Sequence, residues 1–176
     1  ISDQMFRHQV LSLRGEVDTQ HEQMAFNLLR EGLVEQARKV KQMPMMNVLA
    51  DQIVWGRSPV RIDLAGGWTD TPPYCLINGG NVLNIAIELN GQPPLQVYVK
   101  PSQRYEITLR SIDLGAEEHI ADYEHLRCYT MVGSPFSIPK AALSLAGFLP
   151  EFCSAKYNTL REQLQAFGCG IELTLL

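Results

Sequence analysis

Hydrophobic and polar residues follow a helical spacing in the first part of the chain. Over residues 18–41, apolar side chains recur every three or four positions, and most charged side chains fall between them. This spacing predicts an amphipathic helix, with Asp18 as its N-cap and Pro44 preventing its continuation. A shorter helix is predicted over residues 4–13. We interpret residues 1–50 as a helical linker segment.

From Gln52 onward the pattern changes to that of strands. Over residues 60–65, apolar side chains alternate with Arg61 and Asp63, a period of two that predicts a strand with one buried face. Further strands are predicted at residues 53–55, 82–89, 95–99, 105–109 and 170–175. Helices are predicted at 139–148 and 157–167, the second capped by Gly168. This order predicts an α+β fold with a mixed or antiparallel sheet.

Composition and charge narrow the class of protein. The chain has 176 residues, of which 45% are hydrophobic, enough for one globular domain or a domain with an appendage. With 15 basic and 19 acidic residues, its net charge of -4 argues against nucleic acid or an anionic membrane as a partner. No apolar run approaches the roughly 18 residues that span a bilayer. These features predict a cytoplasmic protein without a membrane partner.

The cysteines and histidines predict neither disulfides nor a metal site. The cysteines are scattered, at no metal-binding or redox-motif spacing: Cys75, Cys128, Cys153 and Cys169. Free thiols are therefore expected. His119 and His125 lie beside acidic residues, but their spacing matches no ligand template, and we expect them in solvated loops.

The most chemically distinctive stretch follows the alternating strand. Gly66 and Gly67 free the backbone for a turn. The next residues, Trp68, Thr69 and Asp70, supply an aromatic plate, a hydroxyl and a carboxylate. A monosaccharide presents C–H faces that pack on an aromatic ring and hydroxyls that bond to a carboxylate. The combination therefore predicts a sugar-binding turn.

This stretch resembles a motif of a known kinase superfamily. Residues 66–73, GGWTDTPP, and 79–87, GGNVLNIAI, are similar to the first motif of the GHMP small-molecule kinases, in its fucokinase version. Galactokinase-like members have a Glu-His pair where this chain has Gly67 and Trp68, so their sugar contacts there do not transfer. Arg61 and Asp70 do match. Residues 96–114, 134–136 and 170–175 also resemble the N-terminal part of a fucokinase domain.

The resemblance implies an architecture. Residues 51–176 would form the N-terminal part of a GHMP-kinase-type two-layer α/β sandwich. The loop that cradles the ATP phosphates, and the catalytic aspartate, would follow residue 176, so we expect the fragment alone to be inactive. Residues 1–50 resemble the helical connection that precedes the kinase half of fused enzymes. A nucleotidyltransferase domain upstream is therefore a further expectation.

The resemblance also implies an activity, the transfer of the γ-phosphate of ATP, with Mg²⁺, to the anomeric hydroxyl of L-fucose in GDP-fucose salvage. The expected substrate-binding residues lie in the turn: Gly67, Trp68, Thr69 and Asp70. Arg61 is the expected catalytic residue, because a fixed cation would stabilise charge on the transferred phosphoryl group. Structural alternatives are a pairing of Arg61 with Asp63 and a turn in which Asp70 bonds its own backbone.

Two other functions stay open from the sequence. A heptose-phosphate kinase of the same superfamily carries glycine in place of Trp68 and needs extra basic residues for its substrate's phosphate. A noncatalytic adaptor would use the N-terminal helices to bind a partner and the kinase-like sheet as a scaffold.

Overall fold

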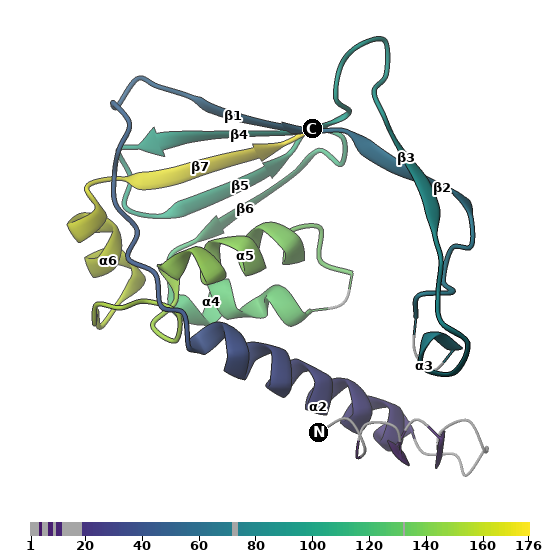
Figure 1. Ribbon diagram of the computed structural model, residues 1–176. Coiled ribbons are helices and arrows are strands. Elements are labelled where there is room, and N and C mark those ends of the chain that lie inside the picture. Colours follow the sequence, from purple (N-terminus) through teal and green to yellow (C-terminus); the bar gives the residue numbers. More distant parts are fainter. Residues whose placement is uncertain (1–3, 5–6, 9, 12–18, 72–73, 132) are drawn as a thin grey trace.

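The computed structural model describes residues 4, 7–8, 10–11, 19–71, 74–131 and 133–176. A long helix, α2 (Thr19–Arg38), precedes a five-stranded sheet with helices on one face, and a two-stranded arm stands beside this body (Figure 1). The predicted α+β class is confirmed. The helix predicted over 4–13 falls mostly, and the N-cap at Asp18 wholly, outside the described residues. No helix in the described ranges is both long and apolar enough to cross a membrane.

The sheet is mixed, with the strand order β1-β4-β7-β5-β6. Its strands are β1 (Val54–Ser58), β4 (Leu95–Ser102), β5 (Ile107–Ser111), β6 (Ala116–Ile120) and β7 (Gly170–Leu175). β7 pairs antiparallel with β4 and parallel with β5. It therefore joins the antiparallel pair β1–β4 to the antiparallel pair β5–β6.

The core lies between this sheet and a layer of short helices. The layer consists of α4 (Tyr123–Arg127), a 3₁₀ turn (Cys128–Thr130), α5 (Ser137–Leu143), a π turn (Ser144–Phe148) and α6 (Leu160–Phe167). Ile107 and Leu109 of β5 and Leu164 of α6 are completely buried. Each such side chain contributes about 1.5–3 kcal/mol on burial. Because helices this short are unstable alone, packing on the sheet is what holds them.

Side chains at the helix ends satisfy free backbone groups. The Asp122 carboxylate accepts a hydrogen bond from the His125 amide at 2.8 Å where α4 begins. Thr159 accepts one from the Glu162 amide at 3.1 Å where α6 begins. Gly168 ends α6 with a φ of 104°, so the predicted cap is confirmed.

The arm is an antiparallel ribbon of β2 (Val60–Ala65) and β3 (Leu83–Ile87), with α3 (Tyr74–Asn78) at its far end (Figure 1). It continues from β1 with Pro59 between the two strands. The aliphatic residues of β2 face those of β3, for example Ile62 opposite Ile85. One face of the ribbon is therefore aliphatic, and the other carries Arg61 and Asp63.

The predicted strands are present, with shifted ends for most, and the strands at 60–65 and 170–175 coincide with β2 and β7. The sequence interpretation missed β6, which contains Glu117, Glu118 and His119. Acidic residues are poor strand formers, and pairing with β5 overrides this preference. The loop placement of two histidines was wrong, because His119 lies in β6 and His125 in α4.

We predict that Leu109→Ala lowers the free energy of unfolding by about 3 kcal/mol, because it leaves a cavity in the core. Leu114→Ala is the matched control, since Leu114 is 64% exposed, and its effect should stay below about 0.5 kcal/mol. Urea denaturation followed by circular dichroism measures both. Equal losses for the two variants would contradict the assigned core.

Candidate functional site

The turn after β2 is built by close backbone contacts. Gly66 has a φ of 74°, and a Cβ at this position would lie 2.0 Å from the carbonyl oxygen of Asn81. A Cβ on Gly80 would lie 2.4 Å from the carbonyl oxygen of Thr69. Both positions therefore require glycine. We call residues 66–70 the β2 turn; it lies directly against the loop 79–81.

The Thr69 hydroxyl fastens these two segments together. Its single proton lies within hydrogen-bond reach of two carbonyl oxygens, that of Gly66 at 2.6 Å and that of Asn81 at 3.1 Å. The Thr69 amide also donates to the Gly66 carbonyl at 3.1 Å. A hydroxyl has one proton and two lone pairs, so Thr69 can offer a ligand only an acceptor.

Trp68 is held in a strained and exposed position. It has a φ of 70°, in the left-handed region, and its side chain is 83% exposed. A bulky residue rarely adopts this backbone conformation. The sequence analysis assigned the turn geometry to Gly66 and Gly67, whereas the positive φ values fall on Gly66 and Trp68. An outlier of this kind favours a functional role.

The polar face of the arm carries the remaining candidates. Nε of Arg61 lies 3.1 Å from Oδ1 of Asp63. Asp70 is exposed, and within the described ranges its carboxylate has no hydrogen-bond or ion-pair partner. Its oxygens therefore remain available as acceptors.

The structure brings four of the five predicted residues into one turn: Gly67, Trp68, Thr69 and Asp70. Arg61 lies on β2 and pairs with Asp63, which lies near the turn, since a Cβ added to Gly67 would lie 3.7 Å from Oδ2 of Asp63. Sequence reasoning treated Asp63 only as a rival partner and gave the Asn81 carbonyl no role. Arg61 and Asp63 are two residues apart and so lie on one face of the strand. This spacing was the sequence signal from which a role for Asp63 could have been inferred.

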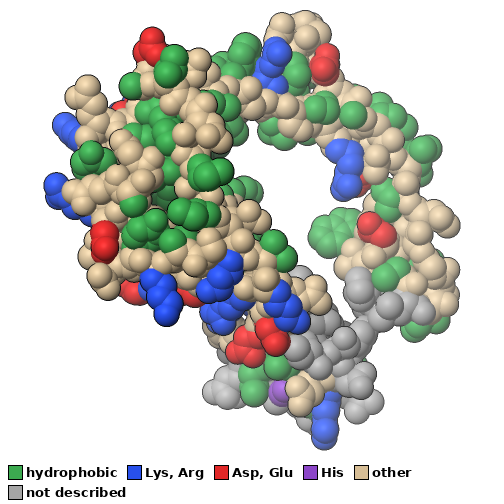
Figure 2. All heavy atoms as spheres, turned by 60° about the vertical axis from the view of Figure 1, so that its left-hand side comes forward, with side chains coloured by type: hydrophobic (Ala, Val, Ile, Leu, Met, Phe, Trp, Pro, Cys, Tyr) green, Lys and Arg blue, Asp and Glu red, His purple; other side chains and the backbone are tan. Residues whose placement is uncertain are grey.

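The aliphatic face of β2 differs from the prediction. The strand is present, but its predicted burial is wrong, since Ile62 is 45% and Leu64 is 57% exposed. Alternation identifies which residues share a face but not whether another element covers that face. Figure 2 shows the arm standing away from the body across an opening.

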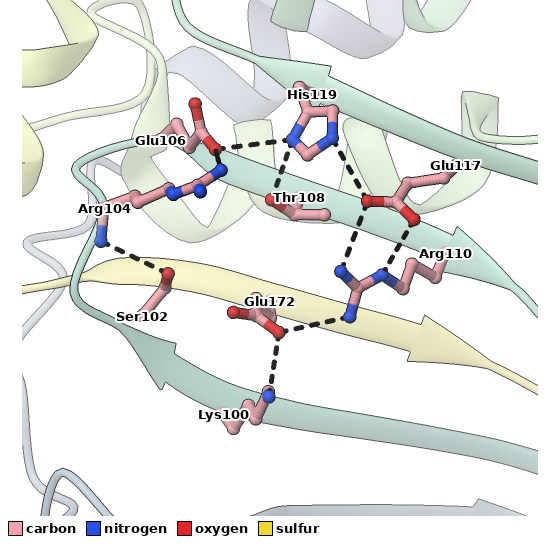
Figure 3. Close-up of polar contacts among 9 residues, drawn as sticks. All are labelled: Lys100, Ser102, Arg104, Glu106, Thr108, Arg110, Glu117, His119 and Glu172. Carbon is pink, nitrogen blue, oxygen red and sulfur yellow. Dashed lines mark hydrogen bonds and ion pairs between the residues drawn. The ribbon is translucent and has the colours of Figure 1, made fainter.

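A separate cavity of about 610 Å³ lies on the outer face of the five-stranded sheet, opposite the helices. Beside it lies a network of polar contacts (Figure 3), of which all members but Glu117 line the cavity: Lys100, Ser102, Arg104, Glu106, Thr108, Arg110, Glu117, His119 and Glu172. Every charged group of this network has an opposite charge beside it, for example Lys100 Nζ at 2.9 Å from Glu172 Oε2. Such pairing favours a structural role on the sheet surface.

These pairs shift the pKa values of Glu172, Glu117 and Arg110. The hydrogen bond from Lys100, aided by the charge of Arg110, holds the pKa of Glu172 below its ordinary value. Arg110 likewise lowers the pKa of Glu117 through its hydrogen bond, and that contact raises the pKa of Arg110. His119 lies between Glu106 and Glu117, with ring nitrogens at 3.3 and 3.1 Å from their oxygens.

The described residues contain no group of three or more side chains suited to a metal ion. His125 Nε2 lies 2.5 Å from Glu118 Oε1. The four cysteines are free thiols.

The chain is similar in sequence to two known proteins. No protein-family model matches it. Over all 176 residues it is 60% identical to the L-fucokinase/L-fucose-1-P guanylyltransferase of Bacteroides fragilis, of which it covers 18%. The chain is homologous to part of a bifunctional fucokinase. It is also 39% identical over 93 residues, 53% of its length, to the bifunctional fucokinase/GDP-fucose pyrophosphorylase of Arabidopsis thaliana, of which it covers 9%.

The fucokinase resemblance read from the β2 turn and its flanks is thus confirmed. This fucokinase homologue spans less than a fifth of the length of these curated relatives. Among solved structures, the mevalonate kinase of Methanococcus jannaschii matches 71% of this chain and 32% of its own, with a TM-score of 0.42 and 16% identity. A TM-score at this level does not establish a common fold.

We predict that Glu172→Gln makes the unfolding free energy less sensitive to acid. The folded-state pKa of Glu172 is lowered, so its stabilisation is present above the ordinary glutamate value of 4.5 and is lost as pH falls below it. The variant should be less stable than wild type at pH 7, by about 0.5 kcal/mol. On acidification its unfolding free energy should fall by less than that of wild type. Urea unfolding at pH 7 and below pH 4 tests this, with the exposed Glu88→Gln as control. An equal fall in unfolding free energy on acidification in wild type and Glu172→Gln would refute the prediction.

We predict that Trp68→Gly is more stable than Trp68→Ala by about 1 kcal/mol, because only glycine relieves the left-handed strain. Leu114 is exposed and lies outside the left-handed region. At this position the glycine variant should be no more stable than the alanine variant. Urea unfolding of the four variants provides the comparison. A more stable alanine at position 68 would show that Trp68 is unstrained.

Proposed function

We propose that this chain supplies the sugar-binding corner of an ATP-dependent L-fucokinase. The enzyme would transfer the γ-phosphate of ATP to the anomeric hydroxyl of L-fucose, giving fucose 1-phosphate. The observation that carries this proposal is the 60% identity, over all 176 residues of this chain, to part of the L-fucokinase/L-fucose-1-P guanylyltransferase of Bacteroides fragilis. The exposed indole of the β2 turn supports it, as does the Asp70 carboxylate, which has no partner among the described residues.

The proposal includes the finer architecture. Residues 51–176 would be the N-terminal part of a GHMP-type kinase domain, with residues 1–50 as its helical linker. The sheet with helices on one face is compatible with a two-layer sandwich. We assign the ATP phosphate loop and the catalytic base to parts of the enzyme outside this chain. The relative's name, which includes a guanylyltransferase, supports a nucleotidyltransferase domain in the same polypeptide.

Sugar binding would rest on Asp70 and Trp68. An ionised carboxylate can accept two hydroxyl protons at once, with charge-assisted hydrogen bonds. The Trp68 indole would pack on the apolar face of L-fucose, including its C6 methyl group. Because galactose carries a hydroxymethyl group there, an apolar plate favours L-fucose. The Gly67 backbone and the acceptor lone pairs of Thr69 would complete the contacts.

Arg61 would act on the transferred phosphoryl group. Phosphoryl transfer passes through a loose transition state, so the protein contributes mainly alignment and charge stabilisation. A guanidinium near the phosphoryl oxygens stabilises their negative charge. MgATP enters as a substrate, and we assign none of the described residues to magnesium.

We favour an L-fucokinase over the two alternatives left open by the sequence, a heptose-phosphate kinase and an adaptor. Both curated relatives are named as fucokinases, and the chain has tryptophan where heptose-phosphate kinases have glycine. An Asp70 carboxylate without a partner in the described part of the chain, beside an exposed indole, is more typical of a binding site than of an inert scaffold, which weighs against an adaptor.

We predict that Asp70→Ala, in the full-length enzyme that contains this chain, raises the KM for L-fucose at least about tenfold, because charge-assisted hydrogen bonds are lost. Trp68→Ala should raise it about three- to tenfold and reduce the preference over galactose. Steady-state kinetics with both sugars measures these effects. Asp51→Ala, which removes an exposed carboxylate before β1, is the control. Unchanged KM values in both variants would remove the assigned site, and a wild type inactive on L-fucose would refute the function.

A further inference from the structure

Asp63 holds the side chain of Arg61. The two residues are two positions apart on β2, so their side chains lie on one face of the strand. Nε of Arg61 lies 3.1 Å from Oδ1 of Asp63, and its Nη2 donates to Oδ2 at 3.5 Å. The guanidinium is therefore held at two points along one of its edges.

This contact leaves most of the guanidinium free. Arginine has five N–H groups, and the contact uses one on Nε and one on Nη2. Three remain, two on Nη1 and one on Nη2, and within the described ranges they have no partner. The Arg61 side chain is 66% exposed, so these groups are accessible. A guanidinium held by two donors keeps its other donors in a fixed direction.

Asp63 also lies close to the β2 turn. A Cβ added to Gly67 would lie 3.7 Å from Oδ2 and 3.8 Å from Cβ of Asp63, so the Asp63 side chain lies beside this glycine. On the neighbouring strand, the small Ala86 lies opposite Arg61, which leaves the arginine room to extend along β2. The Asp63 carboxylate thus pairs with the cation and lies near Gly67 of the β2 turn.

We infer that Asp63 is a positioning residue for the proposed phosphoryl transfer. It fixes the guanidinium of Arg61 so that three N–H groups keep one direction toward the transferred group. This inference rests on the proposed function, in which Arg61 contacts the phosphoryl oxygens. Exposed ion pairs contribute little to stability, so the loss of Asp63 lowers the rate without unfolding the protein.

The kinetic test uses the full-length enzyme that contains this chain. Asp63→Ala should lower kcat about tenfold or more through misalignment, with the KM for L-fucose nearly unchanged, because other residues hold the sugar. Asp63→Asn keeps an acceptor for Nε–H and should restore part of kcat. Glu88→Ala, which removes an exposed carboxylate from the same arm, is the matched control. In an Arg61→Ala background, Asp63→Ala should have no further effect on kcat.

The outcomes separate this inference from the proposed function. Normal kcat in Asp63→Ala, together with impaired kcat in Arg61→Ala, overturns the role of Asp63 and leaves the kinase assignment intact. A full rate loss in Asp63→Asn with no restoration also overturns it, because the inferred role is one of orientation through an acceptor. Wild type that does not phosphorylate L-fucose refutes the kinase assignment and the catalytic part of this inference with it.

A second measurement needs no activity. In the 176-residue chain, the Nε–H of Arg61 should exchange slowly with water in nitrogen-15 NMR spectra, because it is bonded to a carboxylate. The signal is assigned by its disappearance in Arg61→Lys. Asp63→Ala should accelerate the exchange, whereas Glu88→Ala should not. Equal exchange rates in wild type and Asp63→Ala would overturn the contact itself.

Discussion

The hydrogen bonding of β7 to both of its neighbours is the constraint on which the molecule depends. β7 pairs with β4 on one side and β5 on the other. Without it, β1–β4 and β5–β6 would be two separate pairs, and isolated two-stranded pairs are marginally stable in water. The arm continues from β1, so the register of β1, β4 and β7 also sets where the candidate site lies relative to the body.

The arm is stabilised differently from the body. The body buries Ile107, Leu109 and Leu164 completely, whereas the arm leaves the aliphatic face of β2 exposed. At its end, Gly66 allows the backbone of residues 66 and 81 to approach closely, and the Thr69 hydroxyl shares its proton between two carbonyl oxygens. These contacts are local and polar. They fix the shape of the turn without a core, and they leave the side chains of Trp68 and Asp70 directed at solvent.

Much of this arrangement follows from the sequence, and the exceptions have physical causes. Alternation located β2, and the glycine spacing located the turn. The positive φ at Trp68 was not predictable, because local preference assigns such a conformation to the neighbouring glycine. β6 was missed because its acidic residues gain their strand conformation from pairing with β5. Burial of β2 was overestimated because alternation shows which residues share a strand face but not whether another element covers that face.

The two polar regions of the molecule differ in whether their charges are satisfied internally. On the outer face of the sheet, Glu172 is paired with two cations, so a ligand would have to displace an existing contact. On the arm, Asp70 has no described partner and Arg61 retains three N–H groups. Recognition of a sugar and of a phosphoryl group requires such unsatisfied acceptors and donors. The pairing with Asp63 does not remove this capacity from Arg61, because it occupies one edge of the guanidinium and directs the remainder outward.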